Sequence, residues 1–360
     1  MSAPAVHRRS ESAGTSREPR YLSLRLGRLS RRIALSHLVT AAILGVVGVV
    51  ILFTALSLGD TILPLDRVLG AFMPEASRLD HKVVVEWRAP RALAALVFGA
   101  CLGVSGALFQ SLTSNALGSP DIIGLNTGAY SGVLLVITFG GTGYLAYAAG
   151  AVAGGLVTAA IIYLLAYSRG LQGFRLIIVG IAVSAMLSSA NTWFIVKADL
   201  DLALRAAVWG AGTLNGLRWE PLLWAGGVAL VVALLLPWLN RRVGGLELGD
   251  DTATMLGVRV ESSKLALVVI GVIMTALVTA VTGPISFIAL AAPQIAQRIR
   301  PNGGSLDLLG SALMGMILLA GADLVAQHLI PAASVPVGAV TVCIGGLYLV
   351  WLLIREGRRA

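Results

Sequence analysis

The feature that most constrains this chain is a series of long apolar runs, each close to the length needed to cross a lipid bilayer. A spanning helix needs about 20 predominantly apolar residues. Because backbone groups in lipid must be hydrogen-bonded within the segment, and because these runs do not alternate apolar with polar residues, they predict helices rather than barrel strands. The runs lie at 33–58, 91–111, 122–140, 143–167, 174–196, 221–239, 264–282, 285–298, 306–329 and 337–354. We therefore predict an all-α polytopic membrane protein with about ten transmembrane helices.

The composition excludes an ordinary soluble domain of this length. Hydrophobic residues make up 57% of the chain and charged residues only 12%, about half the charged fraction of a typical soluble protein. We expect a basic cytoplasmic leader (1–32), one transmembrane domain (33–355) containing a cytoplasmic loop at about 240–263, and a short tail (356–360).

The charge pattern sets the expected orientation in the membrane. Eight arginines fall within the leader, where they favour an anionic cytoplasmic leaflet by about 1 kcal/mol each; a nucleic-acid-binding arm is the weaker interpretation. Lysines and arginines also gather in alternate short loops and in the tail, at Arg355, Arg358 and Arg359. The positive-inside rule then predicts a multi-pass protein of the cell membrane with both termini in the cytoplasm.

The sequence lacks the motifs of the common enzyme and metal sites. It contains no P-loop, HExxH or GxSxG motif and no cluster of Cys and His. Cys101 and Cys343 both lie within apolar runs, which predicts buried, unreactive thiols rather than a metal site or a disulfide. Ionisable residues are scarce at membrane depth, unlike in ion-coupled carriers. We therefore expect a transporter-like bundle whose energy comes from another protein, with an ion-coupled secondary transporter and a membrane enzyme as rival interpretations.

One charged segment interrupts this pattern, "ELGDDTATMLGVRVESSK" at 247–264. Gly249 ends the preceding segment, Asp250 or Asp251 can cap a short helix, and Gly257 can end it. An interfacial amphipathic helix is one interpretation. A rigid cytoplasmic handle for another protein is the other.

Four blocks in order carry a strong resemblance to the FecCD family, the permeases of iron–siderophore and vitamin B12 ABC importers. The blocks are 247–264 together with "WRAPRALAALVFGACLGVSGALFQSLTSNALGSPDIIGLNTGAYSG" (87–132), "GPISFIALAAPQIAQRI" (283–299) and "VPVGAVTVCIGGLYLVWLL" (335–353). The resemblance runs from about residue 30 to the end. Within the family the chain looks most similar to the G-type subunit of ferric-enterobactin permeases. One departure is Ala116, where the family commonly has proline.

The resemblance implies the fold and the partners. The fold is that of a type II ABC importer permease, a ten-helix subunit that works as a dimer, often with a different second permease. A cytoplasmic ABC ATPase dimer, which holds ATP and Mg, and an extracytoplasmic siderophore-binding protein complete such transporters. The chain itself is then no enzyme and binds no cofactor or metal directly.

The resemblance also implies two sets of contact residues. Arginines at the start of the second helix dock the binding protein; they match Arg88 and Arg91, whose planar groups pair well with carboxylates. A third family arginine is replaced here by Gln327, which favours a heterodimer; snorkelling of the arginines to lipid headgroups is the alternative. The segment that couples to the ATPase is transferred to Gly249, Asp250, Asp251, Thr252, Ala253, Met255, Leu256 and Gly257.

Neutral polar residues in the deep spans are the candidates for a translocation path at the dimer interface. Each could instead serve interhelical packing. The candidate path residues are Gln110, Ser114, Asn115, Asn126, Ser184, Ser188 and Asn191. We expect import of an Fe(III)–siderophore, with a catecholate such as enterobactin as the first choice and vitamin B12, haem or a hydroxamate siderophore as alternatives.

Overall fold

The computed structural model describes residues 21–26, 29–59, 61–167, 172–300, 306–330 and 335–357, and most of them are helical. The elements are β1 (Tyr21–Leu26), β2 (Leu29–Ala34), α1 (Leu35–Ser57), α2 (Leu65–Gly70), α3 (Arg78–His81), a π-helical turn (Lys82–Arg88), α4 (Ala89–Thr113), α5 (Pro120–Ile123), α6 (Leu125–Thr138), α7 (Tyr144–Ala166), α8 (Gly173–Lys197), α9 (Leu200–Gly210), α10 (Trp219–Leu246), α11 (Asp250–Met255), α12 (Val260–Thr282), α13 (Ile288–Ile299), α14 (Leu308–His328) and α15 (Val337–Gly357). The expected all-α membrane bundle is confirmed.

Each of the ten predicted apolar runs is helical, but not every run forms one continuous helix of spanning length. Seven helices among the described residues are long and apolar enough to cross a bilayer, and α6 and α15 are shorter apolar helices. The run expected at 122–140 is divided by Gly124, whose φ of 94° separates α5 from α6. The run expected at 285–298 becomes α13, which is only 12 residues long.

Two boundaries differ from the expectation. The predicted cytoplasmic loop at 240–263 begins too early, because α10 continues to Leu246 and keeps Arg241 and Arg242 within the helix. The first helix begins at Leu35 rather than Ile33, because an antiparallel pair formed by β1 and β2 precedes it. The residues of β1, YLSLRL, alternate apolar with polar side chains, which is the period of a strand. Residues 1–20 of the expected leader lie outside the described part of the chain.

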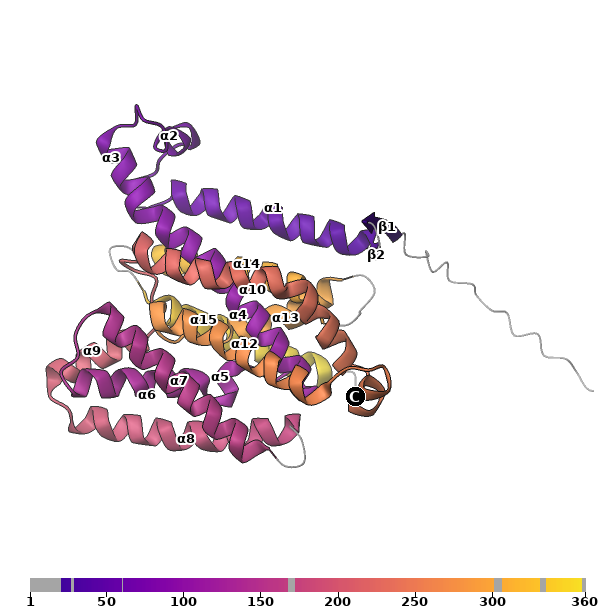
Figure 1. Cartoon of the computed structure of the whole chain (residues 1–360). Coiled ribbons are helices and arrows are strands. Elements are labelled where there is room, and N and C mark those ends of the chain that lie inside the picture. Colours follow the sequence, from indigo (N-terminus) through magenta and orange to yellow (C-terminus); the bar gives the residue numbers. More distant parts are fainter. Residues whose placement is uncertain are drawn as a thin grey trace, which may run out of the picture.

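α4 runs through the middle of the bundle and supplies much of the core (Figure 1). Its glycines allow a very close helix contact with α14. A Cβ atom at Gly99 or Gly103 would overlap the carbonyl oxygen of Gly315 or Ser311, respectively. Small residues spaced four apart permit this approach of two backbones in a membrane helix pair.

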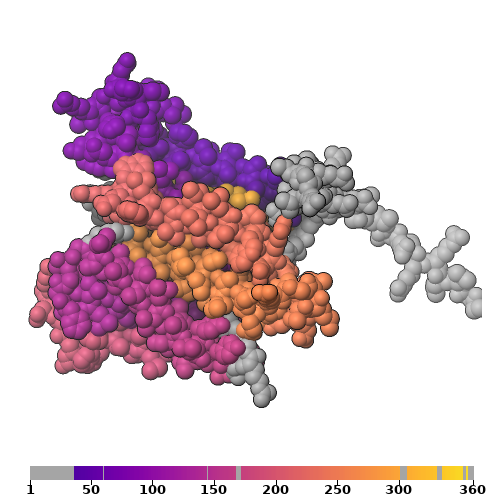
Figure 2. All heavy atoms as spheres, viewed as in Figure 1, coloured from indigo at the N-terminus to yellow at the C-terminus, as the bar shows by residue number. Residues whose placement is uncertain are grey.

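α1 and α8 lie at opposite edges of the bundle, with α2, α3 and α9 gathered at one end of it (Figure 1). α1 is almost wholly apolar and forms a ridge along the surface (Figure 2). Of the two thiols, Cys101 is buried as predicted, but the prediction for Cys343 is wrong: it is exposed on α15. An apolar run cannot show which of its faces is covered by other helices.

Candidate functional site

The charged segment at 247–264 folds into a short helix, α11, held between α10 and α12. Ala253 is fully buried beneath it, while Met255 is 88% exposed and Leu256 is 66% exposed. Lys264 Nζ lies 2.6 Å from Asp250 Oδ2 and fastens α11 to the first turn of α12. The result is a fixed helix that presents two large apolar side chains outward.

The ends of α11 are set by two glycines. Gly249, with φ 90°, occupies the N-cap position, so the expected capping by Asp250 or Asp251 is wrong: both lie in the first turn, where their charges still suit the helix dipole. Gly257 ends the helix as expected, with φ 80°. The Val258 amide donates to Ala253 O and the Gly257 amide donates to Thr254 O. This is the hydrogen-bond pattern of a Schellman motif, and it makes the end of α11 rigid.

The residues expected to dock a binding protein come together at the end of the bundle that carries α2 and α3. Arg88, Arg91 and Gln327 all line one open cleft of about 1710 Å³. Other charged residues along this cleft are Lys82, Glu86, Arg218, Glu220 and His328. The cleft therefore carries charges of both signs.

Both arginines have partners within the chain. Arg88 donates to the carbonyl oxygens of Leu56, Ser57 and Thr61, at 2.9, 3.2 and 2.7 Å, and so closes the turn after α1. Arg91 makes a bidentate pair with Asp323 of α14, with Nη2 to Oδ1 at 2.8 Å and Nε to Oδ2 at 3.0 Å. Their docking role stays a prediction, and their structural role is to hold α4 against α1 and α14.

Gln327 joins the same polar cluster. Its Nε2 atom donates to Asp323 Oδ2 at 2.8 Å, so that the carboxylate of Asp323 accepts hydrogen bonds from both Arg91 and Gln327. The Asp323 side chain is only 3% exposed. The sequence analysis gave Asp323 no role; a lone carboxylate in an apolar run is the signal that could have drawn attention to it.

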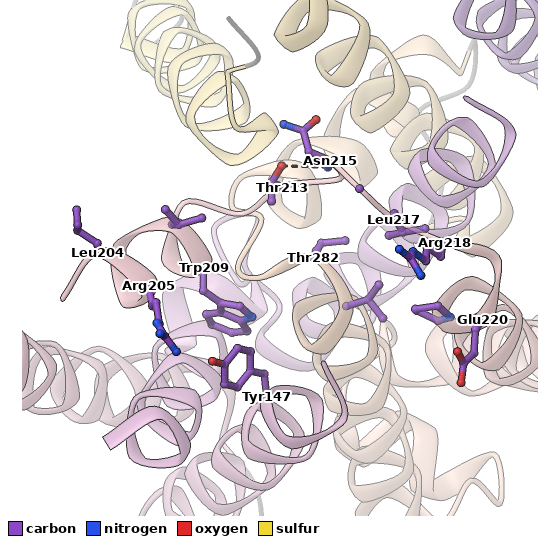
Figure 3. A pocket seen from close by; sticks show the side chains of 14 residues that line it. Tyr147, Leu204, Arg205, Trp209, Thr213, Asn215, Leu217, Arg218, Glu220 and Thr282 are labelled. Carbon is purple, nitrogen blue, oxygen red and sulfur yellow. Dashed lines mark hydrogen bonds between the residues drawn. The ribbon is translucent and has the colours of Figure 1, made fainter. Parts of the chain in front are cut away.

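A second cavity, of about 780 Å³, opens beside the first, and Arg218 and Glu220 line both (Figure 3). Trp209 forms one wall and stacks on Tyr130, with ring centroids 5.9 Å apart and planes 5° from parallel. The Tyr130 hydroxyl donates to Ala206 O and so fixes this aromatic pair. No sequence pattern indicated this cavity, because its walls come from α7, α9, α12 and the segment that follows α9.

The candidate path residues divide into two groups. Gln110 and Asn126 are buried and bonded inside the subunit: Gln110 Nε2 donates to Leu290 O at 3.0 Å, and Asn126 Oδ1 accepts from Thr279 Oγ1 at 3.0 Å. Ser114 and Asn115 are exposed in the turn after α4. The burial of Gln110 and Asn126 is what interhelical packing requires. The assignment of all four residues to the path stays a prediction.

The other candidates lie on α8. Ser184 is half-buried and shares a 3.0 Å hydrogen bond with Thr127 of α6. Asn191 is buried and Ser188 is exposed. The exposed face also carries Ser189 and Thr192, each hydrogen-bonded to its own helix backbone. α8 thus differs from α1: both lie at an edge, but the exposed face of α8 carries several hydroxyl groups.

Comparisons with known proteins agree on one family. The model of the FecCD transport family matches residues 32–355. The ferric enterobactin transport system permease protein FepG of Escherichia coli K12 is 46% identical over 331 residues, which cover 92% of this chain and 99% of that protein. The iron(3+)-hydroxamate import system permease protein FhuG of Bacillus subtilis is 32% identical over 329 residues, covering 88% of this chain and 97% of that protein.

A solved structure shows the same fold. It is described as an inward-facing conformation of a metal-chelate type ABC transporter, and it matches with a TM-score of 0.77 at 24% identity, covering 88% of this chain and 98% of that chain.

Proposed function

Because this chain belongs to the FecCD transport family, we propose that it is the permease subunit of an ATP-driven importer of Fe(III)–siderophores, with a catecholate such as enterobactin as cargo. The high identity to a ferric enterobactin permease over nearly the whole of both chains supports the catecholate class. The chain lies in the cell membrane with its termini and α11 on the cytoplasmic side. Hydrolysis of ATP takes place on a separate ATPase dimer, and a soluble binding protein delivers the cargo from outside.

The observation that carries this proposal is the form of α11. An apolar pair of side chains, Met255 and Leu256, stands exposed on a short helix whose two ends are fixed by Gly249 and Gly257. Large exposed apolar side chains outside the lipid mark a protein contact. A rigid helix anchored to α12 through Lys264 transmits a movement of its partner without deforming, so it suits a seat in a groove of an ATPase.

The translocation path is proposed to lie along α8 at the edge of the bundle, where a second permease subunit forms the rest of its wall. Hydroxyl groups on an exposed helix face are poorly suited to lipid but well suited to a water-containing passage. Ser184, Ser188 and Asn191 are the residues of this helix that we assign to the path wall.

The test replaces the exposed tip of α11. Met255→Glu with Leu256→Glu removes the apolar surface and adds charge, and we expect the ATPase to be lost on co-purification and uptake of ⁵⁵Fe-labelled ferric enterobactin to fall to background. Leu65→Glu is the matched control, since Leu65 is an exposed leucine on α2 at the other end of the bundle. If the ATPase still co-purifies with the double variant, the proposal that α11 binds the ATPase is contradicted. Uptake by the wild-type transporter that persists after ATP depletion, but stops with an uncoupler, favours an ion-coupled carrier instead.

A further inference from the structure

Two of the predicted apolar runs form helices, α6 and α13, that are too short to cross the membrane. α6 has 14 residues and α13 has 12, which correspond to about 21 and 18 Å against a hydrocarbon core of about 30 Å. A non-helical segment precedes each: 114–119, with Gly118, leads to Pro120 at the start of α5 and then to α6, and 283–287, with Gly283 and Pro284, leads to α13. Irregular backbone at membrane depth must find its hydrogen-bond partners within the protein.

Side chains of the helices around the two breaks supply such partners. The Phe287 amide donates to Asp121 Oδ2 at 3.0 Å, across 166 positions of sequence. Gln110 Nε2 donates to Leu290 O, and Gln294 Nε2 donates to Ala116 O. These three bonds join α13 and Phe287, the residue before it, to α4, to the first break and to α5. We call the three side chains that make them, Asp121, Gln110 and Gln294, the clasp.

Asp121 is the one carboxyl group of the clasp, and it accepts hydrogen bonds from Phe287 in the second break and from Asn126 on α6. α13 has no capping side chain of its own: its N-cap residue, Phe287, has a φ of 69°. The carboxylate of Asp121 therefore takes the place of a cap at a helix N-terminus, where negative charge is favoured. Its second oxygen, Oδ1, accepts from Asn126 Nδ2 at 2.8 Å, and Asn126 in turn accepts from Thr279 of α12.

The clasp lies between α11, the proposed contact with the ATPase, and α8, the proposed wall of the path. On one side, α11 is fastened through Lys264 to α12, a continuous helix of 23 residues that ends at the second break. On the other side, α5 and α6 pack against α8: a Cβ at Gly124 would overlap the side chain of Ser184, which is hydrogen-bonded to Thr127. Packed elements of this kind shift as units rather than deform.

We propose that Asp121 is a positioning residue whose carboxylate fastens the two broken helices together, so that a displacement of α11 and α12 is delivered to α5, α6 and the α8 wall of the path. The inference rests on the proposed function. Asp121 needs two acceptor atoms for this role, because the Phe287 amide and the Asn126 side chain both donate to it. An amide at position 121 offers one acceptor only.

An exchange of the two side chains tests this role within the complete transporter. Asn126→Asp alone sets two carboxylates at the 2.8 Å contact, where like charges repel. Adding Asp121→Asn restores every bond: the amide then at position 121 accepts from the Phe287 N–H and donates to the carboxylate then at position 126, which accepts from Thr279. We expect N126D to lower ferric-enterobactin uptake at least about tenfold, and the D121N/N126D pair to recover it to within about threefold.

A second variant distinguishes a positioning role of Asp121 from a role in folding alone. In D121A the ATPase should still co-purify and hydrolyse ATP, and the half-saturating concentration of binding protein should be unchanged, while the iron imported per ATP falls at least about fivefold. Asp66→Ala is the control, since Asp66 is exposed on α2. Three results would each overturn the proposal: an exchange pair no better than N126D, a D121A variant that matches D66A, or a D121A variant that loses the ATPase along with uptake.

The effect of the exchange can also be measured without any cargo, as a change in melting temperature. The melting temperature of the detergent-purified complex should be lowest for N126D and close to wild type for the D121N/N126D pair. If wild-type protein fails to import ferric enterobactin but the melting temperatures follow this order, the choice of cargo is wrong and the contact at Asp121 stands. If import succeeds and the order fails, the proposed function stands and the role of Asp121 is refuted.

Discussion

The pair of Arg91 and Asp323 joins the first turn of α4 to the C-terminal part of α14, and its removal has a predictable cost. Asp323 accepts three contacts from Arg91, at 3.2, 3.0 and 2.8 Å, and a fourth from Gln327 at 2.8 Å. The Asp323 side chain is 3% exposed and that of Arg91 is 19% exposed. Asp323→Ala leaves a largely buried guanidinium without its carboxylate.

Breaking a buried ion pair by removing one partner costs about 3–5 kcal/mol. The lower figure applies here, because the remaining exposure of Arg91 lets water reach part of its charge. With an unfolding entropy of about 2.1 cal/mol/K per residue over a chain of 360 residues, a loss of about 3 kcal/mol lowers the melting temperature by about 4 °C. The double variant Arg91→Ala with Asp323→Ala should fall by less than the sum of the single variants, because it leaves no uncompensated charge.

Thermal unfolding of the detergent-purified chain, followed by the fluorescence of its tryptophans, measures these differences. Asp201→Ala is the matched control, because Asp201 pairs with Arg205 on the exposed surface of α9, where its side chain is 77% exposed; its melting temperature should equal that of wild type within about 1 °C. For Asp323→Ala, a fall of less than about 1 °C, or additive effects in the double variant, would refute the reasoning. Binding-protein affinity gives a further readout: if Arg91 contacts that protein directly, R91A alone weakens it.

Two further predictions follow from the packing and from the exposed face of α8. Gly103→Leu should prevent α4 from closing on α14, because even a Cβ atom there overlaps Ser311 O, and we expect membrane levels of the chain to fall several-fold. Gly227→Leu, at an exposed position of α10 where a Cβ atom meets no other atom within 4 Å, should leave them unchanged, as immunoblotting of membranes will show. The second prediction uses a Cys343→Ser background, which removes the exposed native thiol. In this background Ser188→Cys should form a disulfide cross-link to one of a series of single cysteines placed along the second permease, whereas Val46→Cys on α1 should form none. Failure of every pair with Ser188→Cys would argue against a subunit interface along α8.

The sequence was sufficient for the helical class and for the position of α11, because these depend on local patterns. Apolar length identifies a span whatever packs against it, and a glycine on each side of "DDTATML" marks a short helix in any context. The break at Gly124 was not expected, because the sequence predicted one continuous run at 122–140. Its consequence, two half-length helices that meet through Asp121, depends on a residue 166 positions away and could not be read locally.

The direction of polar side chains was the main information that the sequence lacked. Gln110 and Asn126 were interpreted as path residues because amides are rare in apolar helices. Polarity shows that such a group needs a partner, but it does not show whether that partner is cargo, water or backbone. In the structure the partners are Leu290 O for Gln110, and Asp121 and Thr279 for Asn126. Arg91 posed the same problem, since its partner Asp323 lies 232 positions along the chain.

The positions of the bonded and the exposed polar groups suggest which face of the subunit contacts a second subunit. Inside the bundle, Ser105 of α4 donates to Gly271 O of α12, and Gln110 donates to Leu290 O. At the α1 edge the surface is apolar, as lipid requires. At the α8 edge, hydroxyl groups face outward along a helix that is otherwise long enough to span the membrane. The hydroxyl groups of Ser189 and Thr192 are bonded to their own helix backbone, but a face that gathers several of them suits another subunit or a water-filled passage better than lipid. This is why we propose the path along α8 rather than at the buried amides near the clasp.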